Sequence, residues 1–197
     1  MKLFLIPVIL IGIYVVFQSF MSVYSTKTEK QPYRVVLKDA DLEIRFYPAA
    51  TMATIYSKAT SYKTLSSSGF NKLAKFIFGG NEQKESISMT APVRMSLSEK
   101  GSSMSFVMPE KYATNKLPTP NDKNIQIQKS QPEYVAVIGF SGYANDEKIN
   151  EYRNKLAQIL TKRKIRTKGD FNFLGYNAPF QFLGRTNEIV IPIEWTE

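Results

Sequence analysis

The chain has 197 residues, a length typical of one domain of roughly 100–200 residues. It contains neither cysteine nor histidine, which excludes disulfides, zinc–thiolate sites, Ser-His-Asp triads and histidine metal ligands. The net charge of +9, from 26 basic and 17 acidic residues, favours anionic partners such as acidic lipid, nucleic acid, or a small carboxylate or phosphate. Carboxylate, lysine or tyrosine chemistry and plain binding remain as possible functions.

The N-terminus carries the longest apolar run of the chain. Residues 3–17 are uninterrupted apolar residues after Lys2, and the segment continues with few polar residues to residue 24. Residues 3–24 are long enough to span the ~30 Å hydrocarbon core of a bilayer, whereas the run to residue 17 fits the hydrophobic core of a secretory signal. We therefore expect residues 1–25 to form a hydrophobic helix. It would act as a single-pass membrane anchor, or as a cleaved signal that makes the protein secreted or periplasmic.

A polar linker is predicted for residues 26–32, and a folded domain for residues 33–197. In the first half of this domain, residues 62–78 show the 3–4-residue apolar spacing of a helix, and Gly79-Gly80 follows as a stop signal. Alternating or short apolar segments predict strands at 35–37, 42–46, 50–57, 87–97 and 103–108. Residues 109–123 contain three prolines and are predicted to be a surface loop.

The second half repeats this order of elements. Asn145 is a favourable N-cap for a helix over residues 146–164, and strands are predicted at 124–129, 133–140, 171–175 and 187–194. Each half then reads strand, strand, helix, strand, strand. This order predicts an α+β fold: a distorted antiparallel β-barrel or curved sheet with two flanking helices, built from two pseudo-repeated halves. A ligand groove between a helix and the sheet would suit this shape.

Several ordered segments resemble the SOUL haem-binding family, over about residues 35–195. They are LEIRFYPAATMATI at 42–55, the helix ending in FGGN at 78–81, SISMTAPVRM at 86–95, SFVMPEKY at 105–112, LPTPND at 117–122, GFSGYA at 139–144 and YNAPFQFLGRTNEIVIPI at 176–193. The resemblance implies a distorted β-barrel with two helices, built from two related halves. It also implies binding of haem or a porphyrin, without enzymatic activity.

The resemblance places the tetrapyrrole in a shallow apolar groove beside the first long helix and the loop before the last strand. On the helix, the matching positions are Phe70, Leu73, Phe76 and Ile77. The loop runs from Tyr176 to Arg185 and includes Pro179, Phe180 and Phe182. A porphyrin also needs cations near its propionates, for which Lys72, Lys75 and Arg185 are candidates.

The chain departs from part of the family because it has no histidine to bind iron. Axial ligation is left to tyrosine, methionine or lysine, and Gln181 stands where the family pattern would place a lysine. We therefore expect a tolerant groove that accepts metal-free porphyrins as well as haem. The same side chains also suit structural roles: the apolar helix positions as core, the two lysines as a solvated face, and Arg185 as a partner of Glu188.

Two further hypotheses remain from the sequence. Glu110 could meet a small cationic ligand in a sensor domain, whereas Asp39, Asp41 and Glu43 lie in a predicted hairpin turn and give little support for catalysis. A basic cluster at the end of the second helix could instead bind anionic lipid; it comprises Lys162, Arg163, Lys164, Arg166 and Lys168. Nucleic-acid binding is not expected, because aromatic residues are not interleaved with these cations.

Overall fold

The computed structural model describes residues 12, 14, 28–99, 101–113, 116–179 and 181–196. The hydrophobic helix expected over residues 1–25 lies outside the described residues, except for Gly12 and Tyr14. In the part of the chain that the structure describes, no helix is both long enough and apolar enough to cross a membrane.

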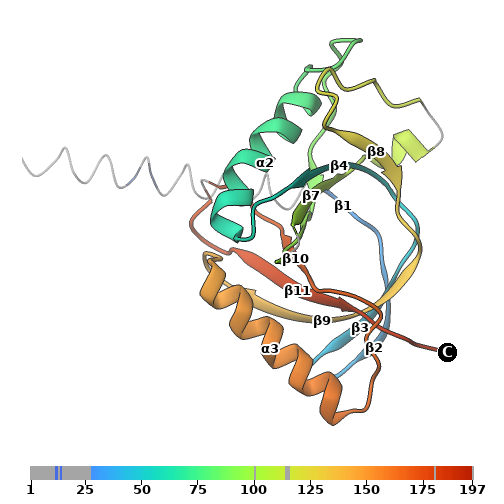
Figure 1. Cartoon of the computed structure of the whole chain (residues 1–197), viewed down its shortest axis with the longest axis vertical. Coiled ribbons are helices and arrows are strands. Elements are labelled where there is room, and N and C mark those ends of the chain that lie inside the picture. The colour runs from blue at the N-terminus through green and yellow to red at the C-terminus, as the bar shows by residue number, and fades with distance from the viewer. Residues whose placement is uncertain are drawn as a thin grey trace, which may run out of the picture.

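The described residues form a strongly curved antiparallel sheet with two helices (Figure 1), together with a small two-stranded sheet. Nine strands follow one another across it in the order β2-β3-β9-β11-β10-β6-β7-β4-β8. Their bounds are β2 (Arg34–Lys38), β3 (Glu43–Tyr47), β4 (Thr51–Ser57), β6 (Val93–Ser96), β7 (Ser102–Val107), β8 (Gln126–Lys129), β9 (Glu133–Ser141), β10 (Asn172–Gly175) and β11 (Thr186–Pro192). The predicted α+β class and curved antiparallel sheet are confirmed.

The strand order is symmetric under exchange of the two halves of the chain. With helices α2 (Tyr62–Ile77) and α3 (Asp146–Lys162), the halves read β3-β4-α2-β6-β7 and β8-β9-α3-β10-β11. Across the sheet, the run β3-β9-β11-β10 mirrors β8-β4-β7-β6, and β10 pairs with β6 at the centre. Each half therefore contributes its first strand to the other half, which ties the two halves into a single sheet.

Both helices begin at a side-chain cap. Ser61 Oγ accepts the Thr64 amide, and Asn145 Oδ1 accepts the Lys148 amide at 2.9 Å. The helices lie on the same side of the sheet (Figure 1), where α2 packs against β4 and β7, and α3 against β9 and β11. The apolar stripe of each helix is thereby removed from water, which is the main source of helix stability in a folded domain.

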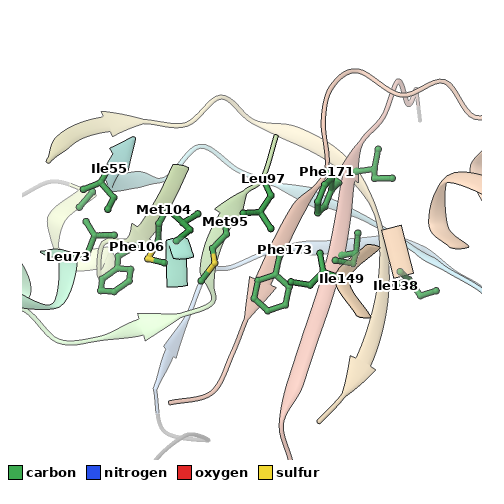
Figure 2. Close-up of a cluster of buried hydrophobic side chains, with 14 of the residues drawn as sticks. Ile55, Leu73, Met95, Leu97, Met104, Phe106, Ile138, Ile149, Phe171 and Phe173 are labelled. Atoms are coloured by element: carbon green, nitrogen blue, oxygen red, sulfur yellow. The ribbon is translucent and has the colours of Figure 1, made fainter. Parts of the chain in front are cut away.

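Three residues of the α2 stripe belong to the main core and do not line a groove. Leu73, Phe76 and Ile77 are each at most 1% exposed, and Figure 2 shows Leu73 beside Ile55, Met104 and Phe106 of the facing strands. Burial of each large apolar side chain contributes roughly 1.5–3 kcal/mol.

Residues 28–32 pack against the domain, although the sequence there reads as a linker. A short strand β1 (Glu29–Lys30) pairs in parallel with β5 (Thr90–Ala91), and the Gln31 amide donates to Ala91 O at 2.8 Å. The region predicted as a surface loop also contains structure. A 3₁₀ turn, η1 (Glu110–Ala113), buries Tyr112, because an aromatic side chain at this position reaches the core cluster.

The end of α2 depends on a close backbone approach at Gly80. Gly79 has φ +98°, a left-handed conformation that favours glycine. The Gly80 amide donates to Lys75 O at 2.8 Å. A Cβ atom at Gly80 would lie 2.4 Å from that same carbonyl oxygen, so a larger residue cannot fit without moving the backbone.

We expect Gly80→Ala to lower the free energy of unfolding by about 1–3 kcal/mol, because the methyl group forces the helix end apart. Gly169→Ala is the matched control, since nothing lies within 4 Å of its added Cβ. Urea unfolding followed by circular dichroism measures both. Equal stability of the two variants would contradict the close contact at Gly80.

Candidate functional site

A small groove opens between α2, the β5–β6 segment and the loop that follows β10. One wall of the groove consists of Phe70, from α2, and of Met89, Ala91 and Val93, from the chain around β5 and β6. The Phe70 ring stands edge-on to Phe106, with 5.4 Å between ring centres, so the core fixes its orientation. This wall of the groove is apolar.

The opposite wall is formed by the loop of residues 176–185. Tyr176, Asn177, Ala178 and Gln181 line the groove from this side, and its volume is about 60 Å³. No side chain with a formal charge lines the groove among the described residues. The groove is therefore narrow, neutral and mostly apolar.

Arg185 holds this loop in shape from within. Its guanidinium donates through Nη1 to Ala178 O at 2.8 Å and to Gln181 O at 2.7 Å. The same group lies 4.5 Å from the centre of the Tyr143 ring, a cation–π distance. Arg185 is only 9% exposed, so the structure places it inside the loop and away from the rim expected for a propionate partner.

Behind the groove lies a buried charged network that positions Tyr176. The Tyr176 hydroxyl donates to Glu188 Oε2 at 2.6 Å. Arg45 of β3 binds both Glu188 oxygens at 2.9 Å, and it also contacts Glu43. Glu188 therefore pairs with Arg45, and Arg185 is not its partner. The Arg45 guanidinium also lies 4.2 Å from the Tyr33 ring centre.

Burial controls the proton affinity of this network. Burial, followed by the adjacent negative charge of Glu188, raises the pKa of Tyr176 above its ordinary value. Burial also raises the pKa of Tyr47, which lies beside Arg45. Burial alone would lower the pKa of Arg45, but its hydrogen bonds and ion pair with Glu188 raise it. Both tyrosines therefore remain neutral hydrogen-bonding groups in the folded protein.

The structure brings together only part of the predicted site. Phe70 and Tyr176 face the same groove, whereas Leu73, Phe76 and Ile77 lie in the core. Lys72 and Lys75 are on the opposite side of α2 from Phe70, as expected for a helix of 3.6 residues per turn. Hydrogen bonds from Asn124, and then the charges of these two lysines, lower the pKa of Asp122, so both cations lie toward the 116–125 loop.

The remaining predicted loop residues lie away from the groove lining or outside the described residues. Pro179 is exposed, and Phe180 is outside the described residues. Phe182 is 50% exposed, and its ring lies 5.9 Å from Tyr143 and 6.1 Å from Tyr14, measured between ring centres. Phe182 therefore contacts other aromatic side chains on the surface.

Sequence reasoning left Met89 and Val93 out of the site and did not single out Ala178 within the predicted loop, although all three line the groove. Met89 and Val93 are in the SISMTAPVRM segment, and Ala178 is in YNAPF. Both segments carried the family resemblance. That shared signal could have suggested that they meet in space, but only the folded sheet brings β6 beside β10.

The acidic residues that the sequence raised as alternatives have partners or lie elsewhere. Arg163 pairs with Asp39 at 2.7 Å and with Asp41 at 3.7 Å, and Glu43 pairs with Arg45. Glu110 is exposed at a separate cleft of about 250 Å³. Within the described ranges, no group of three or more acidic residues is arranged to hold a metal ion.

The structure is an α+β domain: a curved sheet with two helices on one face and, beside the first helix, a mostly apolar groove of the kind in which small ligands bind. The model of the family described as "SOUL heme-binding protein" matches residues 28–192. The chain therefore belongs to the SOUL heme-binding protein family. This confirms the family inferred from the ordered sequence segments.

Relatives in two mammals agree with this membership. The chain is 30% identical to "Heme-binding protein 2" of Mus musculus over 169 residues, which cover 81% of this chain and 82% of the relative. It is 29% identical to "Heme-binding protein 2" of Homo sapiens, with 75% of each chain covered. Among solved structures, the EcmrR C-terminal domain has a TM-score of 0.55 at 14% identity, covering 83% of this chain and 99% of that domain. That likeness concerns the fold alone.

The raised pKa values of Tyr176 and Tyr47 predict loss of stability in alkali. Above about pH 10, the unfolded tyrosines release their protons while the folded ones keep theirs. The folded state then binds more protons, so the free energy of unfolding should fall as pH rises, by up to ~1.4 kcal/mol per pH unit for each group. Urea unfolding between about pH 8 and about pH 11 measures this slope.

Tyr176→Phe should reduce the slope, and Tyr56→Phe, at an exposed position, serves as the control. An alkaline slope that is unchanged in Tyr176→Phe would show that the buried hydroxyl does not carry the effect.

Proposed function

We propose that this chain binds haem or a related porphyrin in the groove between α2 and the 176–185 loop, as a non-enzymatic carrier or buffer. The observation that carries the proposal is the meeting of Phe70 and Tyr176 across a neutral, mostly apolar groove. This groove lies beside the first long helix and the loop before the last strand. Membership of a family described by haem binding supports the same ligand class.

The residues present fit one edge of a porphyrin. The plate is flat and apolar, and Phe70, Met89 and Val93 offer an apolar wall. A cavity of about 60 Å³ is far below the roughly 300–1,000 Å³ that encloses a drug-sized ligand. Most of the macrocycle would therefore lie outside the cavity. Its propionates would point to water, because the described lining carries no cation.

Haem would supply an iron centre, and the groove offers it few donors. Met89 provides a thioether sulfur in the lining, a ligand type that haem iron accepts. Tyr176 donates its hydroxyl proton to Glu188, and burial raises its pKa, so it stays a protonated phenol and does not offer a phenolate ligand. Binding should therefore depend on apolar contact more than on iron ligation, and metal-free porphyrins should bind about as well as haem.

We also propose that residues 1–25 attach the domain to a membrane. The apolar run over residues 3–24 supports this assignment. Tyr14, within that run, contacts Phe182 of the groove loop, which would keep the ligand site close to the attachment. In the basic cluster, Arg163 and Arg166 are paired with acids. Lys162, Lys164 and Lys168 are exposed and would contact anionic headgroups.

Filling the groove should block the ligand. We expect Ala178→Trp to weaken haemin binding at least tenfold, because the indole would occupy the space between the loop and Phe70. Full-length protein in detergent micelles is titrated with haemin and with protoporphyrin, and binding is followed by visible absorption.

Phe78→Ser is the matched control, because Phe78 is an exposed aromatic residue at the end of α2, outside the groove lining. Unchanged binding in Ala178→Trp would place the ligand elsewhere. A large preference for the iron form would contradict the proposed tolerance.

Deleting residues 1–25 should abolish association with vesicles of neutral lipid. Flotation of full-length and truncated protein with vesicles of neutral lipid tests the anchor, and vesicles with anionic lipid test the three exposed lysines. The expected result is flotation of the full chain alone on neutral vesicles. If the truncated protein floats equally well there, the domain surface, and not the N-terminal segment, mediates attachment.

A further inference from the structure

Gln181, one of the residues that line the groove, carries a buried acceptor atom that has no hydrogen-bond partner among the described residues. The other polar side chains around it are engaged: Tyr176 donates to Glu188, Asn177 Oδ1 accepts the Thr186 amide, and Thr90 donates to Val107 O. Gln181 lines the groove and is only 2% exposed. Its Oε1 atom is buried without a hydrogen-bond partner, and such an atom has a large unmet demand for a donor.

The orientation of this amide is set by its neighbours. Gln181 Nε2 donates to Leu183 O at 3.0 Å. Exchanging the two amide atoms would place Oε1 against that carbonyl oxygen, so the assignment of oxygen and nitrogen follows from the contact. The Gln181 backbone is held as well, since its amide donates to Ala178 O and its carbonyl accepts from Arg185 Nη1. These contacts hold the Gln181 amide in one orientation, in which Oε1 remains available as an acceptor.

An acceptor in this position selects the chemistry of the ligand. Carboxylates are acceptors only, so a propionate gains nothing from Oε1. In haem, all four pyrrole nitrogens are bonded to iron and none carries a proton. In a metal-free closed porphyrin, the N–H groups point into the centre of the ring. An open-chain tetrapyrrole differs, because its pyrrole and lactam N–H groups can be presented to a single acceptor beside the chromophore.

We propose that Gln181 Oε1 accepts a hydrogen bond from an N–H group of the ligand and thereby favours open-chain tetrapyrroles over closed iron macrocycles. This inference rests on the proposed function, since it concerns the same groove. Gln181 is then a specificity-determining residue.

The experiment compares biliverdin with haemin on three proteins. Gln181→Leu removes the acceptor with little change in size, whereas Gln181→Glu keeps acceptor oxygens and loses the N–H that binds Leu183. We expect Gln181→Leu to weaken biliverdin binding about fivefold to tenfold and haemin binding less than about twofold. Gln181→Glu should retain biliverdin binding, because charged acceptors bind N–H donors at least as strongly. Absorption titration of full-length protein in detergent micelles measures both ligands.

Lys72→Gln, on the opposite side of α2, is the control, and thermal unfolding verifies that each variant folds. If Gln181→Leu and Gln181→Glu lose biliverdin equally, Gln181 acts only by holding the loop and the inference is overturned. It is also overturned if Gln181→Leu weakens the binding of both ligands alike or of neither. If the wild-type chain binds neither ligand, the proposed function itself fails. This result is read from the wild-type chain, so it is distinct from any result obtained with the variants.

Discussion

Arg45 and Glu188 form the contact on which both the sheet and the groove depend. Arg45 lies on β3 and Glu188 on β11, so the pair bridges across β9, the strand between them. Glu188 also holds the Tyr176 hydroxyl, which forms part of the groove wall. Removing one member of such a buried pair typically costs about 3–5 kcal/mol, because the other charge stays buried and unpaired. The pair therefore links the position of β3, which pairs with a strand of the other half, to the shape of the groove.

The symmetric strand order explains why the groove lies where it does. β10 and β6 meet at the centre of the sheet, and the residues before β6 and after β10 supply its two walls. Because these two strands come from different halves, neither half contains a complete groove. The first helix completes it through Phe70, which is oriented by packing against Phe106. The groove is thus a product of joining the halves.

In ligand binding, the positive charge of the chain would act on the approach of the ligand, and the neutral groove would act on the final contact. A net charge of +9 raises the local concentration of anionic ligands by long-range attraction. Inside the groove, the described side chains are uncharged, and the nearby cations are committed: Arg185 to loop carbonyls and Arg45 to Glu188. Recognition would then depend on shape and on single hydrogen bonds, and charge would affect the rate of approach more than the final contact.

Periodicity determined much of the fold from the sequence alone. The stripes of α2 and α3, the cap at Asn145, and most strands follow from patterns within a few residues, which is the range over which helix and strand preferences act. The absence of histidine likewise limits the ligand chemistry, because composition alone excludes a histidine axial ligand. Only the tertiary structure decided that Leu73 is core while Phe70 is groove, and that Arg185 binds its own loop. It also showed that Gln181 carries the unsatisfied acceptor. Those outcomes depend on which residues distant in sequence meet across β6 and β10, and no local pattern encodes that meeting.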